Sequence, residues 1–182
     1  MRQLQQFSRL ATAATGCVLF AGLVALTGPN KDTLALPSSG PEGESSLRVL
    51  AFRLLPGDDV KTSISGRLKN HHVSAATMIT CVGSLQRAHL RQAGENEGTW
   101  LEGPLEIVSL VGTLGADGSH LHISLSNGQG ATTGGHLLEG SRVFTTAEVV
   151  IGLLPQVSFL RIVDPRTGFK ELQISPSAPS AH

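Results

Sequence analysis

From residue 105 to residue 174 the chain is a series of apolar, β-branched runs, most of them joined by very short turns, and this spacing limits the fold more than any other feature. The runs occupy residues 105–114, 119–125, 143–154, 158–163 and 169–174. Gly115-Ala116-Asp117-Gly118 joins the first two, and Asp164-Pro165-Arg166-Thr167-Gly168 joins the last two. Connections this short cannot carry the chain across a sheet to start a parallel strand, so they predict antiparallel hairpins.

The preceding segment predicts further strands and one helix. Residues 48–55 favour a strand that ends at Pro56-Gly57, and residues 58–71 favour a helix with Asp58 as its N-cap. Residues 75–82 and 85–91 flank Gly83 and predict a bulged or bent strand pair, and the polar residues 92–99 predict a loop. The chain is therefore expected to be α+β, with a mostly antiparallel sheet of about seven strands and one main flanking helix.

The 182 residues suit one domain with extensions. Residues 47–175 hold all the predicted strands and form the expected domain. Residues 29–46 are rich in Gly, Pro and Ser and predict a flexible linker, while residues 176–182 predict a disordered tail. Residues 1–28 predict a targeting or anchor segment.

That N-terminal segment carries Arg2 and Arg9 and has no acidic residue before Asp32. Its apolar run, residues 11–26, is typical of a secretory signal and shorter than the roughly 20 residues of a comfortable membrane span. The first ten residues equally fit the amphipathic helix of a mitochondrial presequence. The expected destination stays open between secretory or membrane and mitochondrial, with membrane contact only through this segment if it is not cleaved.

Charge and cysteine content exclude several classes of protein. The chain has 14 basic residues (Lys plus Arg) and 14 acidic residues (Asp plus Glu). This balance disfavours a domain that binds nucleic acid through electrostatics alone. The two cysteines, Cys17 and Cys81, lie in segments of different character and predict no disulfide framework. There is no Cys-x-x-Cys pair for a zinc ribbon, and Cys81 is expected to be a small buried apolar residue.

Three histidines form the strongest candidate site. In residues 119–125 His120 and His122 share one face of a predicted strand, about 7 Å apart at Cα, and the alternating leucine and isoleucine positions share the other. His136 follows Gly134-Gly135, where the backbone is free enough to fold back toward them. Three neutral imidazoles with an open fourth position suit Zn²⁺ or another divalent ion of similar preference. The competing interpretation is a solvated polar face.

No catalytic residue can be named from the sequence. It has no Gly-x-Ser-x-Gly elbow, no phosphate-binding loop and no dinucleotide fingerprint. Glu102, Glu106 and Glu148 lie in or beside apolar strands, where a carboxylate needs a partner, and arginines in structural ion pairs are expected to supply it.

Six segments taken together resemble the plants and prokaryotes conserved (PPC) domain family over about residues 47–174. They begin with RVLAFRLLPG at Arg48, TCVGSL at Thr80 and GPLEIVSLVG at Gly103, and continue with HLHISL at His120, GGHL at Gly134 and TTAEVVI at Thr145. The resemblance implies a seven-stranded, largely antiparallel α+β domain that assembles as a homotrimer. It also implies that His120, His122 and His136 occupy the positions of metal-binding histidines in some prokaryotic members.

Plant members place this domain after AT-hooks in nuclear DNA-binding proteins, and this chain departs from that arrangement. It has no Arg-Gly-Arg-Pro hook, so minor-groove binding is not carried over. The sequence favours an oligomeric domain with a three-histidine site for a metal or a small-molecule ligand, its activity undetermined. The alternatives are a non-catalytic self-association or protein-interaction module and a metal-dependent, hydrolase-like enzyme in which Glu148 or Glu106 assists.

Overall fold

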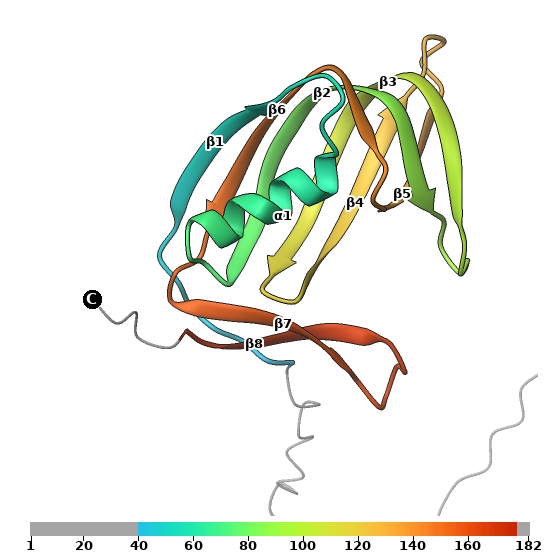
Figure 1. The fold of residues 1–182 in the computed structure, drawn as a ribbon. Coiled ribbons are helices and arrows are strands. Elements are labelled where there is room, and N and C mark those ends of the chain that lie inside the picture. Colours follow the sequence, from blue (N-terminus) through green and yellow to red (C-terminus); the bar gives the residue numbers. More distant parts are fainter. Residues whose placement is uncertain (1–39, 178–182) are drawn as a thin grey trace, which may run out of the picture. The chain divides into compact units, whose positions relative to one another are not determined.

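A computed structural model of the chain describes residues 40–177, and Figure 1 shows their arrangement. Six strands form one antiparallel sheet in the order β1-β6-β2-β3-β4-β5, and two more form a separate hairpin, β7-β8. Eight strands and one helix thus make up the described part, against about seven strands expected. The elements are β1 (Arg48–Leu54), α1 (Val60–Asn70), β2 (Ala75–Arg91), β3 (Gly98–Gly115), β4 (Gly118–Ser126), β5 (Thr132–Leu137), β6 (Arg142–Leu153), β7 (Val157–Val163) and β8 (Lys170–Pro176).

The predicted α+β class with a mostly antiparallel sheet is confirmed. Every strand pair is antiparallel, and α1 crosses one face of the sheet (Figure 1). Val60, Ile64 and Leu68, one helical turn apart, form the buried face of α1 and pack into the core with the inward residues of the strands. Burying this apolar stripe is what holds the helix on the sheet.

Two local predictions about α1 were wrong. The N-cap is Asp59 and not Asp58, and the helix spans Val60–Asn70 instead of 58–71. Asp59 is buried, and its carboxylate accepts hydrogen bonds from the backbone amides of Thr62 (3.0 Å) and Gly140 (2.6 Å). Asp58 has a different role: its carboxylate accepts from the amide of Leu55 and closes the turn after β1.

The sheet also differs from the predicted strand boundaries. β2 is one strand of 17 residues with register shifts along it, which is the predicted bulged pair in continuous form. β3 begins at Gly98, inside the predicted loop 92–99, and β5 was not predicted as a strand at all. β5 pairs with β4 along its length and, at Leu137 and His136, with the end of β2. The sheet therefore curls until its β5 edge meets β2 again.

The β7-β8 hairpin shares a small apolar cluster with the start of β2, formed by Ala75, Val157 and Phe159. Its attachment to the main sheet is through backbone hydrogen bonds, from the Ala116 amide to the Phe159 carbonyl and from the Phe159 amide to the Ser74 carbonyl. This places β7 beside the turn between β3 and β4.

The predicted targeting segment 1–28, most of the predicted linker and residues 178–182 of the predicted tail lie outside the described residues. Residues 40–46 have no regular secondary structure. In residues 40–177 no helix is long and apolar enough to cross a membrane.

Candidate metal centre

The three candidate histidines lie on adjacent strands. His120 and His122 are in β4 and His136 is in β5, where its Cα is paired directly with that of His122. Residues paired across antiparallel strands point to the same side of the sheet. Leu121, Ile123 and Leu125 fill the core from the opposite face of β4 at 3% exposure or less, so the imidazoles are directed away from the core.

The three rings converge on one point. The Nε2 atom of His122 lies 3.0 Å from Nε2 of His120 and 3.2 Å from Nδ1 of His136. One nitrogen from each ring lies within 4.8 Å of the other two. The rings of His120 and His136 are nearly parallel, at 9° with centroids 5.1 Å apart, and the His122 ring stands edge-on between them.

Hydrogen bonding alone does not account for this cluster. A neutral imidazole nitrogen carries either one hydrogen or one lone pair, so Nε2 of His122 can satisfy one neighbour and not both. Two nitrogens bound tetrahedrally to one zinc ion at about 2.0–2.1 Å lie about 3.3–3.4 Å apart, close to the two short separations here. The donor set and its spacing therefore fit a divalent metal ion.

Burial and nearby cations favour the neutral form of two of these histidines, His120 and His136. Desolvation lowers the pKa of His120 below its usual 6.5, and the Arg161 guanidinium lowers it further. Desolvation also lowers the pKa of His136, with Arg91 as the next cause. Since a metal ligand must be an unprotonated nitrogen, both shifts extend the pH range in which the site can bind an ion.

The two glycines before His136 let β5 approach its neighbours closely. A Cβ atom on Gly134 would lie 2.6 Å from the carbonyl oxygen of Ile123 in β4. A Cβ atom on Gly135 would lie 2.8 Å from the carbonyl oxygen of Arg91 in β2. Glycine is therefore needed at both positions for space, and the pair fixes where His136 stands.

Charged residues that the sequence did not single out surround the site. A pocket of about 720 Å³ opens beside His120 and His136, and Lys61, Arg91 and Arg161 contribute to its wall. Arg91 is the register partner of His136 in β2, whereas Arg161 comes from β7, 41 positions after His120. No sequence motif marks these residues, because the pairing of distant strands brings them together.

The predicted acidic partners are elsewhere. Glu106 and Glu148 do not line this pocket, and in the described residues no carboxylate is hydrogen-bonded to the three imidazoles. The carboxylate that acts on His120 is Glu171 of β8, which opposes the lowering of its pKa. The predicted ion pairs of the strand glutamates were also wrong. Glu102, Glu106 and Glu148 are exposed in the single chain and form no ion pair there, since the one ion pair within residues 40–177 joins Arg166 to Asp164.

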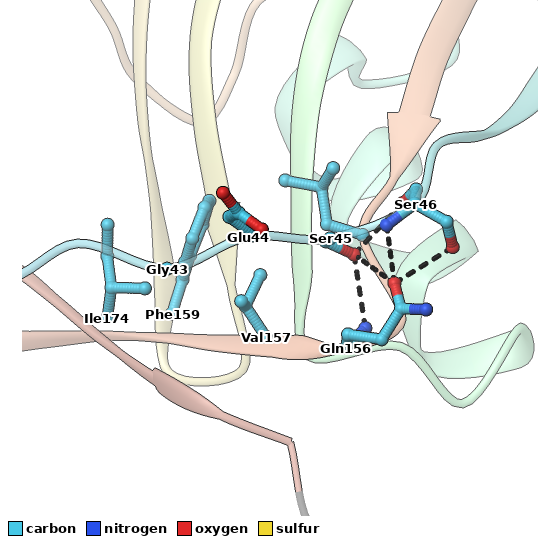
Figure 2. Close-up of a pocket in the computed structure, with 9 residues that line it drawn as sticks. Gly43, Glu44, Ser45, Ser46, Gln156, Val157, Phe159 and Ile174 are labelled. Atoms are coloured by element: carbon cyan, nitrogen blue, oxygen red, sulfur yellow. Dashed lines mark hydrogen bonds between the residues drawn. The ribbon is translucent and has the colours of Figure 1, made fainter.

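A second cavity, of about 810 Å³, lies between residues 43–46 and β7 (Figure 2). Its polar groups are bonded to one another. The side-chain oxygen of Gln156 accepts hydrogen bonds from the hydroxyls of Ser45 and Ser46 and from the Ser46 amide. Val157, Phe159 and Ile174 form its apolar wall. This cavity reflects how residues 43–46 pack against the hairpin and has no cluster of titratable groups.

A curled antiparallel sheet with one helix across it and three convergent imidazoles defines a small α+β domain that could hold a metal ion. Residues 42–155 match the Plants and Prokaryotes Conserved domain family. The chain belongs to this family, and the predicted resemblance is confirmed.

Solved structures share the fold. A hypothetical protein from Salmonella cholerae-suis is 40% identical, with a TM-score of 0.73 over 75% of this chain and 99% of that one. A metal-containing protein from Archaeoglobus fulgidus is 26% identical, with a TM-score of 0.63 over 74% of this chain and 99% of that one. A plant- and prokaryote-conserved protein from Pyrococcus horikoshii is 27% identical, with a TM-score of 0.61 over 72% of this chain and 96% of that one.

Among curated proteins, the bifunctional protein GlmU of Synechococcus sp. strain JA-3-3Ab is 40% identical over 150 residues, or 82% of this chain. The GlmU of strain JA-2-3B'a(2-13) is 39% identical over 142 residues, or 78% of this chain. The matched region is 24% and 22% of those proteins, so this chain spans about a quarter of their length.

Proposed function

We propose that this chain is a metal-binding member of its family and holds one divalent ion, Zn²⁺ by preference, through His120, His122 and His136. The observation that carries the proposal is the approach of two imidazole nitrogens to the single Nε2 atom of His122, at 3.0 and 3.2 Å. Three neutral nitrogens favour zinc over magnesium or calcium, which prefer oxygen ligands. When bound, such an ion supplies Lewis acidity.

Two further observations support the proposal. Desolvation lowers the pKa of His120 and His136, which favours the unprotonated form that a metal ligand needs. In addition, the similar protein from Archaeoglobus fulgidus is described as metal-containing.

Elemental analysis of the purified protein tests the proposal. The wild type is expected to carry about one ion per chain and His122→Ala none, because His122 touches both other ligands. His71→Ala is the matched control, since His71 is the exposed C-cap of α1 and should not affect the ion. A wild type that stays free of metal after incubation with zinc and dialysis would refute the proposal.

We also propose that the chain self-associates, as a homotrimer, through the sheet face opposite α1. Six large apolar side chains on that face are between 46% and 61% exposed, which is unusual for a monomer with a neutral surface. They come from four of the six sheet strands, β1, β2, β3 and β6: Val49, Ile79, Val82, Val108, Val111 and Phe144. Val111 is paired with His122, so this surface borders the histidine cluster.

Light scattering coupled to size exclusion tests the assembly. The wild type should have three times the mass of the chain, and Val82→Asp should shift it toward monomer because it places a charge within the apolar face. Ile162→Asp is the control: its side chain is similarly exposed, at 53%, but lies on β7. A monomeric wild type at micromolar concentration would contradict the proposal.

A further inference from the structure

The basic residues of the pocket beside the histidines come from three separate parts of the domain. Arg91 lies at the end of β2, Lys61 in the first turn of α1, and Arg161 and Lys170 on the β7-β8 hairpin. With a volume of about 720 Å³, it is in the usual range of small-molecule sites. His120 and His136 line it as well, so the pocket and the histidine cluster are continuous.

Its two arginines are held in place without being neutralised. The Nη1 atom of Arg91 donates to the backbone carbonyl of Glu95 at 3.0 Å, and the Nη2 atom of Arg161 donates to the carbonyl of Lys170 at 2.6 Å. Within residues 40–177, no carboxylate oxygen lies within 4.0 Å of either guanidinium. A guanidinium has five N–H donors, so each arginine keeps several for another acceptor.

Two of the three acidic residues of the pocket bind other groups. The carboxylate of Asp117 accepts twice from the backbone amide of Arg161, at 2.9 and 3.2 Å. That of Glu171 accepts from the hydroxyl of Thr167 at 3.0 Å. The side chain of Glu95 forms no hydrogen bond or ion pair in the described structure, since its contact with Arg91 is through the backbone. Three acidic residues face four basic ones, which leaves an excess of positive charge.

A cation bound at the histidines would increase this excess. Arg91 and Arg161 line the same pocket as His136 and His120. A divalent ion held by three neutral imidazoles keeps its full charge and would repel both guanidinium groups. An anion in the pocket removes this repulsion and supplies an oxygen ligand, which three histidines leave room for.

We propose that this pocket binds a small molecule carrying an oxyanion, a carboxylate or a phosphate, between Arg91 and Arg161 and the metal at the histidines. The inference rests on the proposed metal site and names the ligand class for it. Arginine suits this role because its planar donors match two oxygens of one carboxylate or phosphate. Phe169, 73% exposed, forms part of the same wall and offers an apolar surface to the rest of the ligand.

Calorimetric titration of the full chain at low ionic strength tests the inference, with inorganic phosphate and succinate as separate probes. The protein is loaded with one equivalent of zinc and dialysed, and the same titrations are repeated on metal-free protein. At least one probe should bind zinc-loaded wild type, and the stronger probe identifies phosphate or carboxylate as the preferred group. Arg91→Met and Arg161→Met should each weaken binding at least tenfold while zinc content is unchanged.

Lys69→Met is the control, because it removes the same charge from the exposed last turn of α1, outside the pocket. A thermal melt of each variant shows whether it folds. If one arginine variant does not fold, the other still tests the inference. Absence of binding by both probes at tens of millimolar, or equal affinity of the arginine variants and Lys69→Met, overturns the inference. If zinc fails to bind but arginine-dependent anion binding persists in metal-free protein, the metal proposal fails and the anion site stands.

Discussion

Gly134→Ala should weaken metal binding while leaving the fold intact. Gly134 lies two residues before His136, and an added Cβ would stand 2.6 Å from the carbonyl oxygen of Ile123. Ordinary contact begins at 3.4 Å, so the two strands must separate by about 0.8 Å. β5 can yield because it is an edge strand that meets β2 only through its last two residues.

The displacement is large on the scale of a coordination bond. If it is passed to His136, its Nδ1 moves from 3.2 Å to about 4 Å from the Nε2 of His122, beyond the separation of about 3.3–3.4 Å that a tetrahedral zinc ion needs. Perturbing the support of a metal ligand typically costs 10–100-fold in affinity. We therefore expect zinc to bind about 10–100 times more weakly, or roughly 1.4–2.7 kcal/mol.

Competition for zinc with a chromophoric chelator measures this loss. Gly128→Ala is the matched control, because it lies in the connection between the same two strands and its Cβ would meet nothing within 4 Å. Both variants should unfold at similar urea concentrations. Equal zinc affinity of Gly134→Ala and Gly128→Ala would refute the argument that close packing of β5 positions His136.

Three further predictions concern acid and the helix cap. Because folding lowers the pKa of His120 and His136 below 6.5, the unfolded chain binds more protons than the folded chain just below that pH. The stability of the metal-free protein should therefore fall as the pH drops below about 6.5 and be regained above it. Urea titrations between about pH 5 and about pH 8 measure this, and a stability that rises toward acid would contradict it. Zinc affinity should also fall as the pH drops, which the same chelator competition measures. Asp59→Ala should lower the free energy of unfolding by about 1–3 kcal/mol, because it removes the acceptor of two backbone amides; a loss below about 0.5 kcal/mol in urea denaturation would show that the cap is not important.

The sequence predicted the β4 half of the site because β4 has strong local signals. A turn precedes it at residues 116–117, another follows at Asn127, and its alternating leucines determine which face is buried. The orientation of His120 and His122 follows directly from that alternation. Their placement on one side of a strand needed no information from the rest of the chain.

β5 could not be predicted in the same way. Two glycines in six residues lower its strand propensity, and its conformation depends on pairing with β4 and with the end of β2. The choice of Asp59 over Asp58 as N-cap has a similar cause, since Asp59 also binds the amide of Gly140, 81 positions away. In both cases a distant partner decides between local alternatives.

The arginines around the pocket were missed for the same reason. Arg161 reaches His120 because Asp117, in the turn before β4, accepts the backbone amide of Arg161 and fixes the hairpin there. The glutamates were predicted to be paired because their strands looked buried on both sides. One face of the sheet is instead exposed in the single chain, and alternation places these carboxylates on it.

X-ray absorption at the zinc edge of zinc-loaded protein identifies the atoms that bind the ion. We expect three imidazole nitrogens at about 2.0–2.1 Å, with one or more oxygen ligands completing the shell, and one histidine signal fewer in any residual zinc bound by His136→Ala. Zinc coordinated by oxygen alone, or by fewer than two histidines in the wild type, would contradict a metal centre at His120, His122 and His136.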